Sequence, residues 1–316
     1  QNFLKELGLW SMDQAIKSVH KPENIEELES ARYRLKFDEH FFLQLLMALR
    51  RKKTEEANGR VFKEKGPFVK RLYENLPFDL TEAQIRVLKE IRGDLTSTRQ
   101  MNRLLQGDVG SGKTVVAMLI TSIVVGDGAQ VAVLAPTEIL AEQHYKSFKK
   151  YCDLVDISCN LLTGSVANVD KKQILTNLES GDLQLIVGTH SLIQEQVKFQ
   201  DLGLIIVDEQ HRFGVEQRKK LIEKGYSPEI LAMTATPIPR TLAITYHGDL
   251  DVSIIDELPK NRKEITTRVV SPEKMDKVYE FIKSLVKKGQ QCFVVYPVIE
   301  DSENIDIKAA KSGYEF

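Results

Sequence analysis

The spacing of apolar residues along the chain changes at Pro77. Within residues 24–53, apolar positions recur at spacings of three, four and seven, the pattern of one face of a helix. These positions are Leu28, Ala31, Leu35, Phe42, Leu45, Leu46 and Leu49. The pattern predicts a long helix, and packing is the expected role of its apolar face.

Beyond Pro77, short apolar runs alternate with amphipathic stretches. Thr81 is the expected N-cap of a helix over 82–91. The runs predict strands at 103–106, 130–135, 158–162, 183–187, 204–207 and 229–233, and helices that begin near Lys113, Glu138, Val169 and Val215. Because the runs are nearly continuous in Val, Ile and Leu, the predicted fold class is α/β with a buried parallel sheet.

A polar stretch around 259–262 separates this region from a second one. There the pattern predicts a strand at 265–270, a helix at 272–287 and a strand at 291–298, the start of another α/β domain. The predicted domains are a helical linker or bridging segment at 1–77, a first α/β domain at 78–263 and a truncated second α/β domain at 264–316. Since the chain begins with Gln1 and stops soon after a new strand, we expect a fragment of a longer protein.

Composition restricts the functional classes. Hydrophobic residues make up 42% and charged residues 28% of the chain, which is typical of a globular protein rather than a disordered one. The formal net charge is −1, so any contact with nucleic acid must depend on local basic groups. Residues 50–74 carry nine Lys or Arg against four Glu, and this run fits either a solvated face or phosphate contact.

Three cysteines show neither a CxxC pair nor a histidine at metal-binding spacing, which indicates a reducing compartment without a metal framework. No apolar run reaches the ~18–20 residues of a membrane span, and no signal-peptide pattern opens the chain. The expected location is the cytoplasm.

The strongest chemical signal is an eight-residue loop that follows an apolar run and opens a predicted helix. It reads Gly107-Asp108-Val109-Gly110-Ser111-Gly112-Lys113-Thr114 and matches the P-loop pattern GxxxxGK[ST]. Its backbone N–H groups are expected to surround phosphates, with Lys113 at the β- and γ-phosphates and the Thr114 hydroxyl on Mg²⁺. The motif predicts a nucleoside triphosphate site.

An acidic pair follows the predicted strand at 204–207. Asp208 is expected beside the Mg²⁺, and Glu209 is expected to polarise the attacking water. Acidic pairs at strand ends are common, so this interpretation depends on the P-loop upstream.

Five further residues are assigned through their place relative to the P-loop and the acidic pair. Gln84 is expected to read adenine, as a carboxamide can pair with N6 and N7 of that base; an exposed helix glutamine is the alternative. Thr234 and Thr236 follow a predicted strand and either cap the next helix or couple the nucleotide site to nucleic acid. Gln210 and His211 are expected to serve the same coupling through hydrogen bonds.

Phosphate-binding candidates stand at three predicted strand ends and after the acidic pair. They are Pro136, Thr137, Thr163, Gly164, Thr189, Arg212 and Arg218. Hydroxyl and N–H groups at helix starts suit phosphate contacts that position rather than specify a sequence. Ordinary turn chemistry for the strand ends, and a solvated surface for the two arginines, remain the alternatives.

Four segments carry a family resemblance: 135–144 (APTEILAEQH), 208–215 (DEQHRFGV), 233–243 (MTATPIPRTLA) and 248–259 (GDLDVSIIDELP). Together with the P-loop, they resemble superfamily 2 helicases, and within these the RecG family of branch-migration helicases. The Mfd family shares Thr-Ala-Thr-Pro-Ile-Pro-Arg, but it would be expected to carry Glu-Glu-Gln in place of Glu-Gln-His, and it lacks Asp-Glu-Leu-Pro.

The resemblance implies a RecA-like P-loop NTPase domain, preceded by a helical segment and followed by a truncated second RecA-like domain. It implies ATP and Mg²⁺ as cofactors, and an ATP-dependent DNA helicase or translocase that acts on stalled forks and Holliday junctions in DNA repair and recombination. It further implies a monomeric bacterial motor on the nucleoid, with a single-strand DNA-binding protein as partner.

In this family, a wedge domain precedes such a motor, and an arginine finger lies in the second motor domain. Neither is expected within these residues, so the fragment alone is expected to be inactive. A nucleotide-gated nucleic-acid clamp, an Mfd-like translocase and an RNA helicase remain the alternatives.

Overall fold

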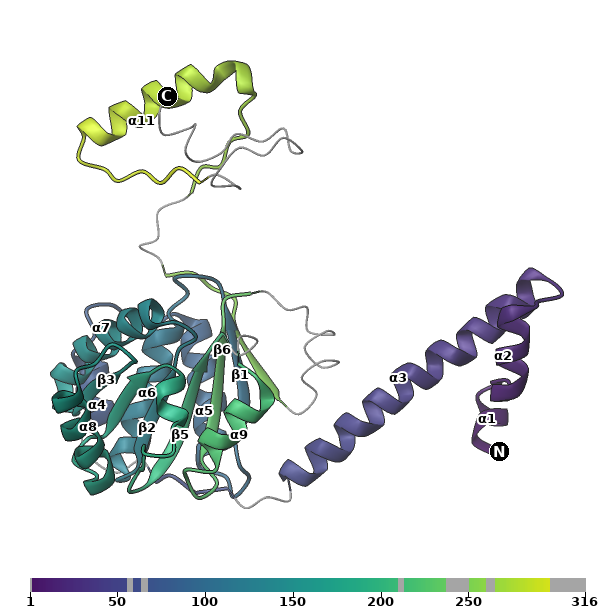
Figure 1. Cartoon of the computed structure of the whole chain (residues 1–316), viewed down its shortest axis with the longest axis horizontal. Coiled ribbons are helices and arrows are strands. Elements are labelled where there is room, and N and C mark those ends of the chain that lie inside the picture. Colours follow the sequence, from purple (N-terminus) through teal and green to yellow (C-terminus); the bar gives the residue numbers. More distant parts are fainter. Residues whose placement is uncertain are drawn as a thin grey trace. The chain divides into compact units, whose positions relative to one another are not determined.

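The computed structural model describes residues 2–55, 59–63, 68–209, 213–236, 250–259 and 265–295 (Figure 1). The chain divides into two compact units, 1–262 and 263–316. Within the described ranges of the first unit, seven strands form one sheet in the order β3-β4-β2-β5-β6-β1-β7. The strands are β1 (Asn102–Gly107), β2 (Gln130–Leu134), β3 (Cys159–Leu162), β4 (Leu185–Gly188), β5 (Leu202–Asp208), β6 (Glu229–Thr234) and β7 (Asp251–Ile255). All neighbouring strands pair in parallel, which confirms the predicted fold class.

Helices connect the strands and begin where the sequence predicts. The described helices are α1 (Asn2–Glu6), α2 (Met12–His20), α3 (Ile25–Glu55), α4 (Phe68–Glu74), α5 (Glu82–Leu95), α6 (Lys113–Gly126), α7 (Glu138–Val155), α8 (Asn168–Ser180), α9 (Val215–Ile222) and α11 (Met275–Lys287), with short 3₁₀ turns η1 (His190–Ile193) and η3 (Pro272–Lys274). Thr81 caps α5 with a capping box, and Thr137 caps α7. Both caps satisfy N–H groups that the first turn of a helix leaves without partners.

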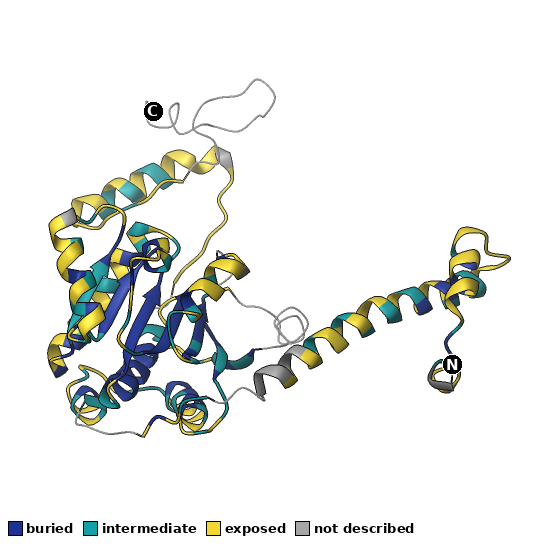
Figure 2. Ribbon diagram, turned by 60° about the horizontal axis from the view of Figure 1, so that its bottom comes forward, coloured by how far each residue is buried: buried dark blue, intermediate teal, exposed yellow. Residues whose placement is uncertain are grey.

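The sheet is covered on both faces, and Figure 2 shows its strands as the buried centre of the first unit. Val131 and Val133 of β2 belong to one apolar cluster, with residues of α4 to α7. Ala132 and Leu134 point to the other face and pack with α8, α9 and η1. Because successive side chains of a strand alternate between faces, a strand covered on both sides must be apolar throughout.

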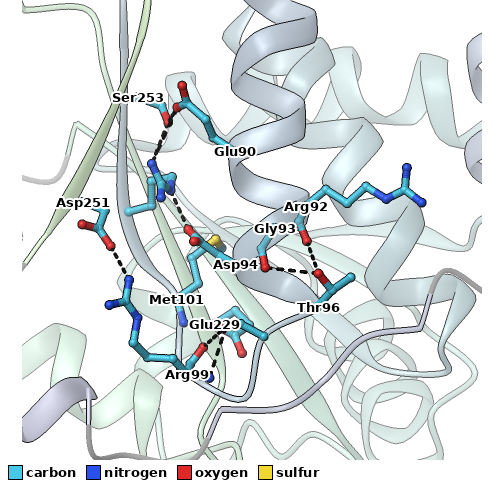
Figure 3. Close-up of polar contacts among 12 residues, drawn as sticks. Glu90, Arg92, Gly93, Asp94, Thr96, Arg99, Met101, Glu229, Asp251 and Ser253 are labelled. Carbon is cyan, nitrogen blue, oxygen red and sulfur yellow. Dashed lines mark hydrogen bonds and ion pairs between the residues drawn. The ribbon is translucent and has the colours of Figure 1, made fainter.

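The strand β7 has no counterpart in the predicted elements. It pairs with β1 at the edge of the sheet, from Arg103↔Asp251 to Gly107↔Ile255. Polar side chains hold it there. Arg99 forms a 3.0 Å ion pair with Asp251 (Figure 3). Arg103 donates a 2.9 Å hydrogen bond to Ser253. A short strand that alternates polar and apolar residues gives a weak sequence signal, and its partner strand lies about 150 positions earlier.

Helix α3 confirms the predicted helix but only part of the predicted packing stripe. Ala31 is fully buried in it, whereas Phe42 and Leu49 are 62% and 58% exposed. The reason is length: α2, with nine residues, spans about 14 Å, whereas α3, with 31 residues, spans about 46 Å. The short helix therefore covers only the first turns of the long one.

The second unit differs from its prediction. Helix α11 is present, but residues 265–270 and 291–295 form no strand. The apolar side chains of Phe281 and Val286 on α11 are 61% and 55% exposed. An extended run forms a strand only beside a partner that supplies its ladder of hydrogen bonds, and the described part of this unit contains no such pair.

Within the described residues, no helix combines the length and apolar composition that a membrane crossing requires.

Candidate nucleotide-binding site

The P-loop connects the end of β1 to the start of α6 and depends on its glycines. Gly110 and Gly112 have φ angles of +81° and +90°, in the left-handed region that glycine adopts without strain. Space is also restricted, because a Cβ on Gly112 would lie 2.3 Å from Nε2 of Gln84. A Cβ on Gly107 would lie 2.5 Å from Oγ of Ser111. The loop thus packs tightly on itself at the N-terminus of α6.

Lys113 and Ser111 are held close to this backbone. The Nζ of Lys113 donates to the carbonyl oxygens of Gly107 and Asp108, at 2.7 and 3.0 Å. Burial lowers the pKa of Lys113, and the carboxylates of Asp208 and Glu209 oppose that change.

The hydroxyl of Ser111 is fully buried and has no hydrogen-bond partner among the described residues. A buried orphan hydroxyl is costly, and a bound phosphate oxygen would satisfy it.

Gln84 joins the N-terminus of α5 to the P-loop. It is 2% exposed, which contradicts the alternative of an exposed helix glutamine. Its Oε1 accepts from the N–H of Thr81 at 2.9 Å, and its Nε2 donates to the carbonyl of Ser111 at 2.8 Å. Each end of a carboxamide can make a second hydrogen bond, so a contact with adenine stays a prediction.

The acidic pair stands at the end of β5. Asp208 is 9% exposed, and its Oδ2 lies 2.7 Å from Nε2 of His144, a residue of α7. Glu209 has a φ of +49°, an uncommon value for a residue with a side chain that typically costs about 1–3 kcal/mol. Its N–H donates to the carbonyl of Met233 at 2.9 Å, which fixes the strained backbone against β6.

The carboxylate of Glu209 contacts the turn that follows β6. It accepts from the hydroxyl of Thr234 at 3.1 Å and from the N–H of Ala235 at 3.2 Å. The same hydroxyl oxygen accepts from the N–H of Thr236 at 3.1 Å. The structure therefore brings the acidic pair and the threonine turn into direct contact. Gln210 and His211, assigned to the same coupling, lie outside the described residues.

The phosphate-binding candidates that follow β2, β3 and β4 lie at one edge of the sheet. In the order β3-β4-β2, Leu162 and Leu134 both pair with Gly188, so the three strand ends lie side by side. The start of α7 links the ends of β2 and β3. The hydroxyl of Thr137, which follows β2, caps this helix. Oε1 of Glu138, its first residue, accepts from the N–H of Gly164, which follows β3, at 2.9 Å.

The hydroxyls of this edge are engaged locally. Those of Thr163 and Thr189, residues that are each 2% exposed, bond to Ser165 and Ser191. These are the contacts of turns and caps, and contact with nucleic acid stays a prediction.

Of the two arginine candidates, the structure describes only Arg218. Arg218 lies half-buried on α9, and its Nε is hidden from solvent without a partner in the described ranges. Arg212 lies outside those ranges. The basic run at 50–74 is partly structural, because Arg60 and Arg71 form ion pairs with Asp201 and Asp156 at 2.5 and 2.8 Å.

The site also fits Mg²⁺. This ion takes oxygen ligands, usually one or two from the protein together with phosphate and water. The hydroxyl of Thr114, in the first turn of α6, and the carboxylate of Asp208 are donors of this kind. The described part of the chain contains no cluster of three or more His, Cys, Asp and Glu that could hold a metal.

The sequence pattern did not single out His144 as a residue of this site; its only signal was its place in the segment 135–144.

Comparisons with known proteins match this arrangement. A family model described as DEAD/DEAH box helicase matches residues 81–244. The ATP-dependent DNA helicase RecG of Synechocystis sp. is 47% identical, over 100% of this chain and 38% of that protein. The protein of the same name in Bacillus subtilis is 47% identical, over 95% of this chain and 44% of its own length. A solved structure of RecG bound to a three-way DNA junction has a TM-score of 0.83 and 43% identity, over 95% of this chain and 40% of that one.

Proposed function

The chain belongs to the DEAD/DEAH box helicase family and to its RecG branch, and from this we propose that it forms the ATP-binding half of a DNA motor. It spans less than half the length of the relatives compared above. The proposed activity of the whole protein is ATP-dependent translocation on branched DNA, such as stalled forks and Holliday junctions. The RecG structure solved with a three-way junction supports this choice of substrate.

One observation carries the proposal. The strands β5, β6 and β1 are neighbours in the sheet: the P-loop follows β1, Asp208 ends β5, and the carboxylate of Glu209 accepts from the hydroxyl of Thr234 at the end of β6. The ends of these three strands therefore lie together beside the P-loop. Ligands of parallel α/β sheets bind at the carboxyl ends of the strands, where loops can converge.

Each residue of this site has a proposed task. Lys113 and the loop N–H groups hold the β- and γ-phosphates, and Thr114 and Asp208 hold Mg²⁺. When bound, Mg·ATP supplies the phosphoryl group that water attacks. Glu209 orients that water, and its contacts with Thr234 and Ala235 transmit the state of the site to the threonine turn.

The nucleic acid is proposed to lie along the ends of β2, β3 and β4. The N–H groups and hydroxyls there would contact the phosphate backbone, with Arg218 as a further basic contact. Residues 1–77 are the proposed bridging segment, 78–263 the first RecA-like domain and 264–316 the start of the second. From the resemblance, we also propose a monomeric motor in the bacterial cytoplasm, on the nucleoid, with a single-strand DNA-binding protein as partner.

The test uses the full-length protein at one fixed salt concentration, because affinities for nucleic acid depend strongly on salt. Steady-state phosphate release and strand separation are measured with a three-way DNA junction, linear duplex DNA and duplex RNA. We expect the junction to stimulate hydrolysis most and to be unwound. Nucleotide-dependent binding without stimulated hydrolysis would indicate a clamp, and a preference for RNA would indicate an RNA helicase.

A further inference from the structure

His144 lies on α7, the helix that begins at the proposed nucleic-acid contacts, and its side chain reaches Asp208 of the nucleotide site. Its Nε2 lies 2.7 Å from Oδ2 of Asp208, and the side chains of this pair are only 15% and 12% exposed. The ring of His144 also lies beside the ring of Phe148, with the ring centroids 6.4 Å apart. Phe148 itself is fully buried. The imidazole thus lies close both to a core side chain and to the carboxylate of Asp208.

The helix that carries His144 begins in the proposed nucleic-acid edge. Thr137 caps α7, and Glu138, its first residue, accepts from the N–H of Gly164 at the end of β3. His144 follows the cap by seven residues, about two turns or 10 Å of helix. A helix that is packed along its length moves as one body, and Ala141 and Phe148 are both fully buried. A displacement of Thr137 would therefore reach His144.

We propose that His144 is a positioning residue that sets the orientation of the Asp208 carboxylate and couples it to the nucleic-acid edge through α7. The inference deepens the proposed function and rests on it. A hydrogen bond to a ligating carboxylate fixes which oxygen faces the metal, and loss of such a bond typically costs ~10–100-fold in metal affinity or activity. His144 is not among the residues proposed to hold the phosphates, Mg²⁺ or the attacking water, so its effect is expected to pass through Asp208.

Two substitutions separate positioning from packing. His144→Gln places an amide nitrogen at about the reach of Nε2, whereas His144→Asn ends nearer to the position of Nδ1 and leaves Asp208 without its partner. Both variants replace the ring by a smaller carboxamide. A role in packing alone would therefore be lost in both, whereas a positioning role would be restored by Gln. Lys146→Ala, at an exposed position of the same helix, is the matched control.

The experiment measures binding of a fluorescent ATP analogue to the full-length protein across a Mg²⁺ titration, with and without a three-way DNA junction. For His144→Asn, we expect the Mg²⁺ midpoint to rise ~10-fold and the DNA-induced change in that midpoint to shrink. Binding without Mg²⁺ should remain as in wild type. His144→Gln should recover most of the loss, and Lys146→Ala should match wild type throughout. Thermal unfolding of each variant monitors the fold.

The possible results distinguish failure of this inference from failure of the proposed function. Wild-type Mg²⁺ midpoints in both His144 variants, or equal losses in both together with lower unfolding temperatures, would overturn the inference. If wild type shows no stimulation of hydrolysis by DNA, the proposed function fails. The Asn-to-Gln comparison of Mg²⁺ midpoints without DNA then still decides whether His144 positions Asp208.

Discussion

The carboxyl ends of the strands form one edge of the sheet and the amino ends form the opposite edge. Both edges hold buried charged or polar groups, but the backbone around these groups differs. At the carboxyl edge, the P-loop glycines and Glu209 adopt left-handed backbone angles, and the hydroxyl of Ser111 is buried without a partner in the described residues. At the amino edge, Glu229 is fully buried and accepts from the N–H of Met101 (Figure 3). Oε1 of Glu229 is likewise buried without a partner in the described residues, so the two edges differ in backbone conformation rather than in the presence of a buried oxygen without a partner.

The amino edge also fixes the segment 59–63. Phe62 is fully buried, and its N–H donates to the carbonyl of Leu95 at 2.8 Å. The guanidinium of Arg60 lies 5.0 Å from the centroid of the Phe62 ring and forms an ion pair with Asp201. In a parallel sheet all strands point the same way, so the loops that can converge on a ligand gather at one edge only. The comparison predicts that changes at the carboxyl edge impair activity, whereas changes at the amino edge impair stability.

The largest expected effect is on hydrolysis at the carboxyl edge. Glu209→Gln in the full-length protein should lower hydrolysis by about 10²–10⁴-fold, because the water loses its orienting carboxylate. Binding of Mg·ATP should remain, since the amide can still accept from Ala235. Asp208→Asn should instead weaken Mg²⁺-dependent binding. Phosphate release and nucleotide affinity measure the two effects.

Glu216→Gln, at an exposed position of α9, is the control and should leave both quantities unchanged. Near-normal turnover of Glu209→Gln would contradict the assignment of that carboxylate.

At the amino edge, Phe62→Ala should lower the free energy of unfolding by about 3–5 kcal/mol, the usual cost of emptying a buried aromatic site. A Cβ added to Gly203 would lie 3.0 Å from Cζ of the Phe62 ring, which shows how closely the ring is packed. Denaturant unfolding measures the change, and nucleotide affinity of the folded protein should stay as in wild type.

Val61→Ala is its control, because Val61 is 37% exposed and should change stability by about 0.5 kcal/mol or less. A weaker nucleotide affinity of folded Phe62→Ala would show that the two edges are not independent.

Two glycines with the same backbone angle allow a direct comparison of the edges. Gly112 and Gly128 have φ angles of +90° and +89°. A Cβ on Gly128, in the turn before β2, would meet nothing within 4 Å, whereas one on Gly112 would meet Gln84. Backbone strain of about 1–3 kcal/mol should therefore appear in both alanine variants.

Only Gly112→Ala should in addition displace Gln84 and weaken nucleotide binding. Unfolding midpoints and nucleotide titrations of both variants test this. Equal nucleotide affinities would mean that the contact with Gln84 does not shape the loop.

The last expected effect is a change in stability with pH, and it arises from Glu229. Burial raises the pKa of Glu229 from 4.5 to about 8, while the backbone N–H groups of Met101 and Arg60 oppose the shift. Between these two pH values, the folded state binds the proton more tightly than the unfolded chain, so stability falls as pH rises toward 8. The contribution is complete below pH 4.5 and is lost as pH passes about 8, with a slope of at most about 1.4 kcal/mol per pH unit.

Glu229→Gln should remove this slope between pH 6 and 8, as measured by denaturant unfolding. An unchanged slope in the variant would assign the pH dependence to other groups.

The sequence alone determined the features that depend on neighbouring residues. The P-loop, its position between a strand and a helix, and the starts of α6, α7 and α9 at Lys113, Glu138 and Val215 appear as predicted. Glycine at positive φ, a capping threonine and an apolar run that needs two covered faces are local requirements, and each leaves its mark in the sequence. The acidic pair was equally visible, because it ends a buried run.

Only the tertiary structure decided which of these local elements meet. It placed β7 beside β1, His144 beside Asp208 and Gln84 beneath the carbonyl of Ser111. It also left the second half of the α3 stripe exposed and the candidate strand at 265–270 unformed. Strand pairing and side-chain contacts between distant segments depend on which surfaces are already covered, and no periodicity within a single segment encodes that.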